Sequence, residues 1–277
     1  MSRTVRIGKA NSAYQVLASL RSNRVKRHRL RQFLVEGVQP INIALDRGWR
    51  VEAVVSSQGR PHSRWAADIV ARAAAPVHYE LTADLFAALS GKSEPSELLV
   101  VLRVPVDDLE RIPVTPDLLA AVVDRPSNPG NLGTLIRSCD AFGVHGLAVT
   151  GHGVDVYDPA TITASRGSLF AVPVVRSGAP ADIIGWADRV RAAVGRCLLV
   201  GADERGATDV DRHDFLQPTI VVLGNETAGL SRPWQQACDV LVRIPMSGAA
   251  SSLNVGVAGS VVFYEAMRQR RRAAADT

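Results

Sequence analysis

The second half of the chain alternates apolar runs of strand length with longer segments in which apolar and polar residues are mixed. The apolar runs end in polar or glycine-containing turns, and they occupy residues 118–124, 145–151, 197–202, 219–225 and 240–246. Helix-like segments lie between them, for example 131–143 and 180–195. Near-continuous apolar strands that alternate with helices are typical of a parallel sheet covered on both faces. We therefore predict an α/β fold with a parallel sheet for this half.

The first part of the chain has the same alternation on a smaller scale. From residue 33 to residue 104, short strand-like and helix-like segments follow one another. The stretch "PVDDLERIPVTPD" then combines three prolines with several acids, a composition typical of a linker. We predict a smaller α/β domain at 1–105, a linker at 106–117 and the larger parallel-sheet domain at 118–277.

The overall composition is that of a globular protein. Of the 277 residues, 47% are hydrophobic and 21% are charged, which permits a sizeable core. No apolar run reaches the roughly 18 residues that a membrane span needs. The first residues lack the apolar segment of a signal peptide, and Cys139, Cys197 and Cys238 lie far apart. We expect a cytoplasmic protein with reduced thiols and no membrane contact.

Positive charge is concentrated near the start of the chain. Residues 1–35 contain nine Lys or Arg and no Asp or Glu, although the net charge of the whole chain is only +5. The densest part, residues 21–31, is typical of a helix face that binds nucleic acid phosphates. Arg24, Lys26 and Arg27 are the candidate contacts. The alternative interpretation is a solvated basic helix with no ligand.

Common nucleotide-binding and catalytic patterns fit this sequence poorly. The "GKS" at 91–93 lacks the first glycine of a P-loop, because Phe86 stands there. The "GHG" at 151–153 lacks the third glycine of a dinucleotide fingerprint, so an oxidoreductase is disfavoured. No G-x-S-x-G elbow occurs, and the six histidines are scattered without ligand spacing. No metal is therefore expected.

Three segments combine turn residues with polar side chains, and each follows one of the predicted strands. They are 124–143, 223–231 and 244–254. Each one alone is compatible with ordinary turn chemistry or a helix cap. Because the carboxyl ends of parallel strands share one edge of a sheet, the three together predict a ligand site there.

These segments resemble the three motifs of the SpoU branch of the SPOUT RNA methyltransferases, which methylate the ribose 2′-oxygen with S-adenosylmethionine. The stretches "NPGNLGTLIRSCDAFGVHGL", "QPTIVVLGNETAGLS" and "SGAASSLN" carry the resemblance, and "FLVEGVQPI" resembles the start of the family's L30e-like RNA substrate-binding domain. The sequence of these stretches is most similar to that of actinomycete avilamycin-resistance enzymes, which act on a uridine of 23S rRNA. Thiostrepton-resistance enzymes are more distantly similar.

The resemblance implies a cofactor, partners and a topology. The cofactor is S-adenosyl-L-methionine, the substrate is 23S rRNA or the 50S subunit, and antibiotic resistance is the expected consequence. The larger domain is expected to contain a deep trefoil knot and to form a homodimer. Cofactor contacts, many of them from the main chain, are implied for Val200, Gly201, Gly224, Ile244, Met246 and Leu253.

The resemblance also implies roles in the chemistry. Arg137 matches the family's catalytic arginine, which we expect to orient a phosphate and stabilise the attacking oxygen. The remaining motif positions are expected to hydrogen-bond the ribose, Arg137 or the loop, and they are Asn131, Glu226, Ser252 and Asn254. Arg166 matches an RNA-contacting arginine of the thiostrepton-resistance enzymes.

The last predicted helix, from Ser252 to about residue 270, contains several small residues near its start. Interior glycines lower helix stability by roughly 1 kcal/mol each. We expect Gly256, Gly259 and Ser260 to permit close packing inside the knot and against a second subunit.

The sequence leaves two alternatives to the 23S rRNA activity. They are a tRNA 2′-O-ribose methyltransferase, which usually lacks the N-terminal domain, and a non-catalytic RNA-binding module.

Overall fold

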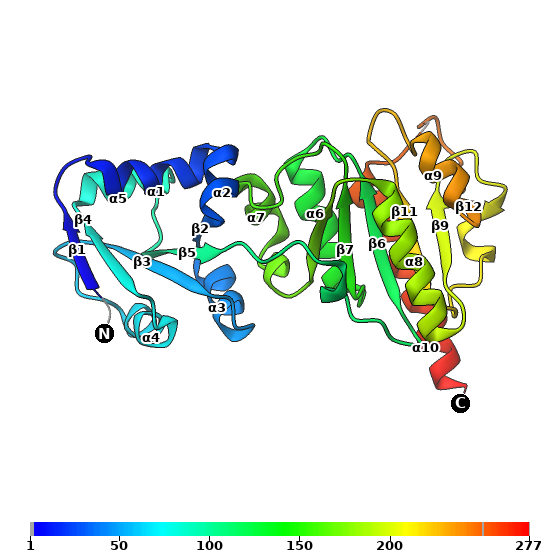
Figure 1. Ribbon diagram of the computed structural model, residues 1–277, viewed down its shortest axis with the longest axis horizontal. Helices are drawn as coiled ribbons and strands as arrows, with labels where there is room; N and C mark the ends of the chain where they lie inside the picture. The colour runs from blue at the N-terminus through cyan, green and yellow to red at the C-terminus, as the bar shows by residue number, and fades with distance from the viewer. Residues whose placement is uncertain (1–2, 251, 277) are drawn as a thin grey trace. The chain divides into compact units, whose positions relative to one another are not determined.

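The computed structural model describes residues 3–250 and 252–276. The chain forms two compact units (Figure 1). Unit 1 contains Met1–Pro105 together with Tyr157–Ile162, and unit 2 contains Val106–Val156 and Thr163–Thr277. No helix among the described residues is both long enough and apolar enough to cross a membrane.

Unit 1 is built on a five-stranded mixed sheet with the strand order β1-β4-β3-β5-β2. The first three strands in that order are parallel, whereas β5 pairs antiparallel with both β3 and β2. The strands are β1 (Arg3–Ile7), β2 (Gln32–Glu36), β3 (Val51–Ser57), β4 (Val77–Leu81) and β5 (Leu98–Arg103). The helices are α1 (Ser12–Ser22), α2 (Arg24–Leu30), α3 (Val38–Asp46), α4 (Arg64–Ala73) and α5 (Ala83–Ser90).

The core of unit 1 forms where α1 and α5 cover one face of this sheet. Leu17 and Leu20 of α1 and Phe86 and Leu89 of α5 are buried in one cluster with alternate strand residues. The alternation follows from the two-residue side-chain period of a strand, which sends every second residue to the same face.

Unit 2 is built on a seven-stranded sheet in which all pairs are parallel, in the order β10-β12-β9-β11-β6-β7-β8. The strands are β6 (Leu119–Asp124), β7 (Gly146–Thr150), β8 (Val174–Ser177), β9 (Leu198–Ala202), β10 (Thr208–Asp209), β11 (Thr219–Leu223) and β12 (Val240–Arg243). The helical segments are η1 (Leu109–Arg111), α6 (Pro129–Ala141), α7 (Pro159–Ser165, which begins in unit 1), η2 (Ser168–Phe170), α8 (Pro180–Val194), η3 (Val210–Arg212), α9 (Arg232–Ala237) and α10 (Val255–Ala275).

Helices cover both faces of the seven-stranded sheet (Figure 1). On one face, Trp186 of α8 and Trp234 of α9 are fully buried against strand residues such as Val122 and Ile220. On the other face, α6 and α10 pack side by side. The predicted α/β fold with a parallel sheet is confirmed. The sequence pattern did not single out β8 and β10, which are short strands at the two edges of the sheet.

The small residues of α10 pack closely against α6 of the same chain. A Cβ at Gly259 would collide with Leu135 of α6, and a Cβ at Gly256 would lie 3.3 Å from the Asn131 carbonyl oxygen. The Ser260 hydroxyl lies 2.6 Å from the hydroxyl of Ser138. The expected close packing thus involves α6 of the same chain, and the contact of this helix with a second subunit stays a prediction.

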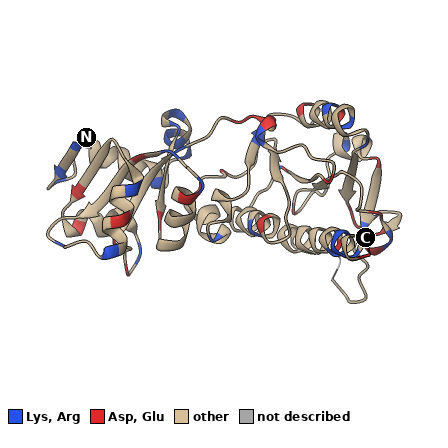
Figure 2. Ribbon diagram, turned by 90° about the horizontal axis from the view of Figure 1, so that it is seen from below, with Lys and Arg blue, Asp and Glu red and all other residues tan. Residues whose placement is uncertain are grey.

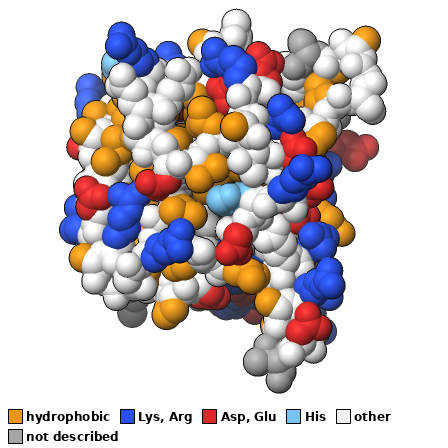
Figure 3. All heavy atoms as spheres, turned by 90° about the vertical axis from the view of Figure 1, so that its right-hand side faces the viewer, with side chains coloured by type: hydrophobic (Ala, Val, Ile, Leu, Met, Phe, Trp, Pro, Cys, Tyr) orange, Lys and Arg blue, Asp and Glu red, His pale blue; other side chains and the backbone are white. Residues whose placement is uncertain are grey.

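The surface charge of unit 2 is mixed. On the face shown in Figure 3, basic and acidic side chains are interspersed. Unit 2 also contains ion pairs, including Arg243 with Asp209 and Arg205 with Asp203. The net positive charge of the chain is therefore not gathered on this face.

Candidate active site

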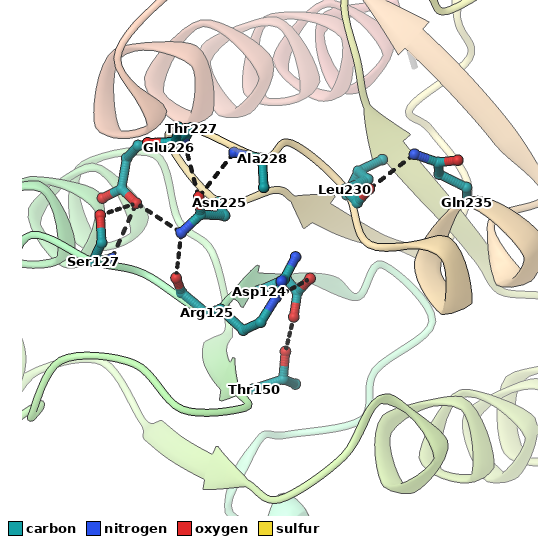
Figure 4. Close-up of polar contacts among 10 residues, drawn as sticks. All are labelled: Asp124, Arg125, Ser127, Thr150, Asn225, Glu226, Thr227, Ala228, Leu230 and Gln235. Carbon is teal, nitrogen blue, oxygen red and sulfur yellow. Dashed lines mark hydrogen bonds and ion pairs between the residues drawn. The ribbon is translucent and has the colours of Figure 1, made fainter.

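The site lies at the carboxyl edge of the seven-stranded sheet, which we define by the ends of β6, β7, β9, β11 and β12. At the end of β6, the carboxylate of Asp124 is only 2% exposed. It accepts a hydrogen bond from the Thr150 hydroxyl at 3.1 Å and pairs with Nε of Arg125 at 3.1 Å (Figure 4). The Asn225 side chain, from the turn after β11, donates to the Arg125 carbonyl at 2.7 Å. These contacts fix the turn after β11 to the loop after β6.

Glu226 extends this connection to the start of α6. Its carboxylate accepts hydrogen bonds from the Ser127 backbone N–H (3.0 Å), the Ser127 hydroxyl (2.8 Å), the Asn128 backbone N–H (3.3 Å) and the Asn131 side chain (3.1 Å). A carboxylate beside unpaired N–H groups at a helix N-terminus is favourable, because the helix dipole is positive there. Glu226 therefore holds the loop that leads into α6.

The protonation state of Glu226 follows from these partners. Burial acts to raise its pKa, but hydrogen bonds from backbone N–H groups, Asn131 and Ser127 outweigh burial, so the pKa is lowered. Hydrogen bonds to the charged form of a carboxyl group stabilise that form. Glu226 is thus an ionised acceptor surrounded by donors, and it is poorly suited to take a proton from a ribose hydroxyl.

Asn131 and Asn254 continue the network from Glu226 to α10. The side-chain oxygen of Asn131 accepts from the Asn254 side-chain nitrogen at 2.8 Å, and the Asn254 oxygen accepts from the Gly256 backbone N–H at 2.9 Å. A carboxylate can only accept and a backbone N–H can only donate, so the two ends fix the orientation of both amides. We call the chain from Glu226 through Asn131 to Asn254 the amide relay.

A cavity of about 540 Å³ opens beside this relay. Its walls come from the loop after β9, the turn after β11, the segment after β12 and the start of α10. The lining residues are Ala202, Asp203, Glu204, Arg205, Leu223, Gly224, Asn225, Glu226, Thr227, Ala228, Gly229, Val242, Ile244, Met246, Ser252, Leu253, Val255 and Ala258. Aliphatic side chains alternate with glycines and polar groups, as expected for a ligand with an apolar ring and charged ends.

Of the six predicted cofactor contacts, the structure brings four to this cavity: Gly224, Ile244, Met246 and Leu253. A Cβ at Gly224 would collide with the backbone of Gly229 and Leu230, so only glycine fits the turn. Val200 and Gly201 do not line the cavity. They lie within β9, Val200 is fully buried, and a Cβ at Gly201 would meet Leu241 at 2.6 Å.

The predicted catalytic residues divide into two groups. Asn131, Glu226 and Asn254 form the amide relay, and Ser252 lines the cavity with its side chain exposed. Arg137 is not brought to them. It follows Asn131 by six residues in α6, which places it about 9 Å along the helix and about 120° around it. Its side chain is exposed, and it has no hydrogen bond or ion pair to any residue that the structure describes.

The predicted RNA-binding residues also differ from one another. Arg166 is exposed in unit 2, on a left-handed backbone with φ of 53°. In unit 1, Arg24 and Lys26 lie on α2, exposed and half-buried respectively. Figure 2 shows where Lys and Arg occur along the chain. Arg27 is only 3% exposed: its guanidinium donates to the carbonyls of Leu20 and Arg21 at the end of α1. Arg27 is therefore removed from the set of phosphate-binding candidates, because its donors already have partners within unit 1.

Sequence reasoning missed several residues of the carboxyl edge. Ser127 and Asn225 were not predicted as site residues, although their side chains hold the relay in place. Asp203 and Glu204 line the cavity from the loop after β9. The sequence pattern predicted the strand but no site residue in this loop. The available signal was position: each of them follows the end of a parallel strand. Among the described ranges 3–250 and 252–276, no cluster of three or more His, Cys, Asp or Glu side chains is placed to hold a metal ion.

Comparison with known proteins gives a consistent result. The profile described as "SpoU rRNA Methylase family" matches residues 118–264, and the profile "SpoU L30e-like domain" matches residues 11–101. The 23S rRNA (uridine(2479)-2′-O)-methyltransferase of Streptomyces viridochromogenes is 46% identical over 96% of this chain and 92% of that protein.

Solved structures agree with this. The AdoMet complex of the SpoU methyltransferase AviRb from Streptomyces viridochromogenes superposes with a TM-score of 0.89 at 45% identity, over 95% of this chain and 99% of that one. An AdoMet-bound rRNA methyltransferase from Sinorhizobium meliloti superposes with a TM-score of 0.85 at 26% identity, over 96% of this chain and 98% of that one.

Proposed function

The chain belongs to the SpoU rRNA methylase family, and we propose that it transfers the methyl group of S-adenosylmethionine to the ribose 2′-hydroxyl of a uridine in 23S rRNA. The cavity bordered by the amide relay carries this proposal. The cavity is large enough for the cofactor, and it lies beside the N-termini of α6 and α10, which a bound substrate would approach. The similar Streptomyces enzyme acts on a 23S rRNA uridine, which supports the choice of substrate.

The cavity residues fit S-adenosylmethionine in their chemistry. Ile244, Met246 and Leu253 supply apolar surface for the adenine, and the Gly224 turn exposes backbone groups at close range. Asp203 is neutralised by its ion pair with Arg205, which lines the same cavity, so the carboxylate that would suit a cationic ligand is that of Glu204. When bound, the sulfonium supplies a methyl group that is already electrophilic, and the protein's task is to position and activate the ribose oxygen.

Arg137 is proposed to act on that oxygen. A guanidinium holds its proton in proteins, so we assign Arg137 to orienting the adjacent phosphate and stabilising the developing alkoxide rather than to proton removal. Glu226, Asn131 and Asn254 position the loop and both helix N-termini through the relay. Ser252 is proposed to hydrogen-bond the ribose from the cavity wall.

The position of Arg137 favours an active site shared between two copies of the chain. Arg137 lies on the exposed flank of α6, away from the relay of its own chain. On the neighbouring flank of α10, Val257 is 46% and Tyr264 is 51% exposed, and Tyr264 contacts Phe142 edge-on. A homodimer that covers this apolar strip would be self-complementary, and it would bring Arg137 to the partner's cavity.

Further proposals follow from the family. We assign residues 1–105 to an L30e-like RNA-binding domain in which Arg24 and Lys26 contact phosphates, 106–117 to a linker and 118–277 to the catalytic domain. Arg166 is proposed as a further RNA contact. A trefoil knot in the catalytic domain is proposed from the family resemblance alone. Resistance to a ribosome-targeting antibiotic is the proposed consequence, with action in the cytoplasm on 23S rRNA or the 50S subunit.

The test is methylation of 23S rRNA with labelled S-adenosylmethionine, followed by mapping of the modified ribose as a primer-extension stop at low dNTP. One defined stop at a uridine is expected. Labelling of tRNA instead of rRNA would replace this proposal with the tRNA alternative. Cofactor binding without transfer to either RNA would support a non-catalytic RNA-binding module.

A further inference from the structure

Arg125 is a charged side chain at the carboxyl edge to which the proposed reaction assigns no role. It follows directly on Asp124 at the end of β6, and its side chain is 39% exposed. Its Nε is paired with Asp124. The two terminal nitrogens of the guanidinium have no partner among the residues that the structure describes. Half of the side chain is thus anchored, and the outer half is available.

The backbone of Arg125 adopts a conformation that arginine does not favour. Its φ is 50°, in the left-handed region, where a residue with a Cβ carries a strain of about 1 kcal/mol or more that glycine avoids. Four contacts maintain this conformation: its N–H donates to the Thr150 carbonyl at 2.9 Å, its carbonyl accepts from Asn225, and its side chain has Asp124 and Gly151 as neighbours. A Cβ on Gly151 would lie 2.7 Å from the Arg125 Cγ, so glycine there leaves room for the arginine stem.

The anchor itself is rigid. Asp124 is buried, and its second oxygen is occupied by the Thr150 hydroxyl, so the carboxylate cannot rotate freely. An arginine held through Nε presents its outer two nitrogens as a planar fork, the geometry that matches a phosphate group. The Asn225 contact fixes this fork relative to the cavity, because Asn225 also lines the cavity wall.

We propose that Arg125 binds a backbone phosphate of the RNA next to the methylated nucleotide, with Asp124, Thr150 and Asn225 as positioning residues. This inference rests on the proposed function, since it takes RNA as the ligand. A purely structural arginine, needed only to neutralise Asp124, would direct its remaining donors to protein carbonyls, as Arg27 and Arg270 do. Arg125 leaves these donors at the surface.

The experiment compares Arg125→Ala and Arg125→Lys with wild type, and with Arg196→Ala as the matched control. Arg196 is an exposed arginine at the opposite edge of the same sheet, before β9. RNA affinity is measured on a 23S rRNA fragment over a salt titration, cofactor affinity by calorimetry, and KM for RNA by methyl transfer. For Arg125→Ala we expect a roughly tenfold weaker RNA affinity and a slope of log K against log salt that is smaller by about 1. Cofactor affinity should stay within about twofold.

The other variants separate position from charge. Arg125→Lys should keep the salt slope but raise KM for RNA, since a lysine cannot form the fork. Asp124→Asn should act in the same direction, because the charge remains while its anchor is lost. Wild-type RNA affinity and salt slope in Arg125→Ala would overturn the proposal. If wild-type enzyme methylates no rRNA, the proposed function fails, while the salt titration still decides whether Arg125 contacts RNA.

Discussion

An arginine on the exposed flank of α6 and an arginine in the last turns of α10 have opposite surroundings. In α10, the guanidinium of Arg270 donates to the carbonyls of Phe215 (3.0 Å), Leu118 (3.1 Å) and Gln217 (3.1 Å), and also to that of Asp117. Burial lowers the pKa of Arg270, and the nearby Asp117 carboxylate opposes this. In α6, Arg137 is exposed and has no such partner among the described residues.

The contrast shows how to distinguish a structural arginine from one kept for a ligand. Backbone carbonyls that converge on a guanidinium satisfy its donors inside the fold, whereas a guanidinium without protein partners has its donors available. Unit 1 contains the same distinction on one short helix. Arg27 is bound by carbonyls at the end of α1, while the neighbouring Lys26 side chain is half-buried at the surface.

The largest effect is expected from Arg137→Ala. Because Arg137 is proposed to stabilise the attacking oxygen, the rate of methyl transfer should fall by about 100- to 1,000-fold. The melting temperature and the cofactor affinity should stay at their wild-type values, since the side chain has no partner to lose among the residues that the structure describes. Single-turnover methylation and calorimetry measure the two quantities. Substantial turnover in this variant would contradict the proposed contrast, because Arg137 would then be neither a structural nor a catalytic arginine.

Arg270→Ala should give the converse result. The carbonyls of Leu118 and Gln217 keep a second donor in Thr219, whereas that of the buried Phe215 loses its donor, so the free energy of unfolding should fall by about 2 kcal/mol. Urea unfolding measures this loss, and Arg271→Ala, at an exposed position of the same helix, is the control. Activity per folded molecule should be retained. A variant of wild-type stability with reduced turnover would reverse the assignment of the two arginines.

Glu226→Gln extends the comparison of structural and ligand-binding groups to the carboxyl edge, where the Glu226 carboxylate contributes to both the fold and the site. We expect a loss of about 1 kcal/mol in unfolding free energy, a modest value because the carboxylate is partly solvated. The pKa of Glu226 is lowered from its ordinary value of 4.5. Its contribution is therefore present above pH 4.5 and is lost as the pH falls through the folded-state pKa.

Unfolding titrations between neutral and acid pH measure this contribution. The difference in stability between wild type and Glu226→Gln should be largest near neutral pH and should shrink in acid. A difference that grows as the pH falls would contradict the proposed ionised, hydrogen-bonded state of Glu226.

The smallest effect is expected from Arg268→Ala, two residues before Arg270. Arg268 donates two hydrogen bonds of 2.7 Å to Glu265, whose side chain is 11% exposed, but its own side chain is 44% exposed. Solvent screens the attraction on the arginine side, and Glu265 keeps Gln269 as a donor. The melting temperature should therefore fall much less than in Arg270→Ala. A destabilisation as large as that of Arg270→Ala would show that the number of carbonyl partners does not set the contribution of an arginine.

The fold was more predictable from the sequence than the site. The core strands of unit 2 are apolar on both faces, so β6, β7, β9, β11 and β12 were evident from continuous hydrophobic runs. The edge strands β8 and β10 have only four and two residues, and they contain polar side chains. Hydrophobic pattern alone cannot separate such short strands from loops.

The site was predictable in its location and less so in its contacts. Strand ends and turn residues indicated the correct edge of the sheet, and four of the six predicted cofactor positions line the cavity. The burial of Arg27 and the carbonyl contacts of the half-buried Arg270 could not be read from local sequence, because their partners lie in other elements of the chain. Basic residues that look alike in composition are therefore distinguished only by tertiary contacts.

The position of Arg270 near the end of the chain has a consequence for biosynthesis. Its partners lie at 117–118 and 215–217, and Gln269 beside it bonds to the backbone of His213 and Phe215. All of these segments are translated before the residues that join them. While α10 is still inside the ribosomal exit tunnel, unit 2 lacks these contacts. Unit 2 can therefore complete its fold only once α10 has emerged, and a nascent chain stalled before that point should bind no cofactor.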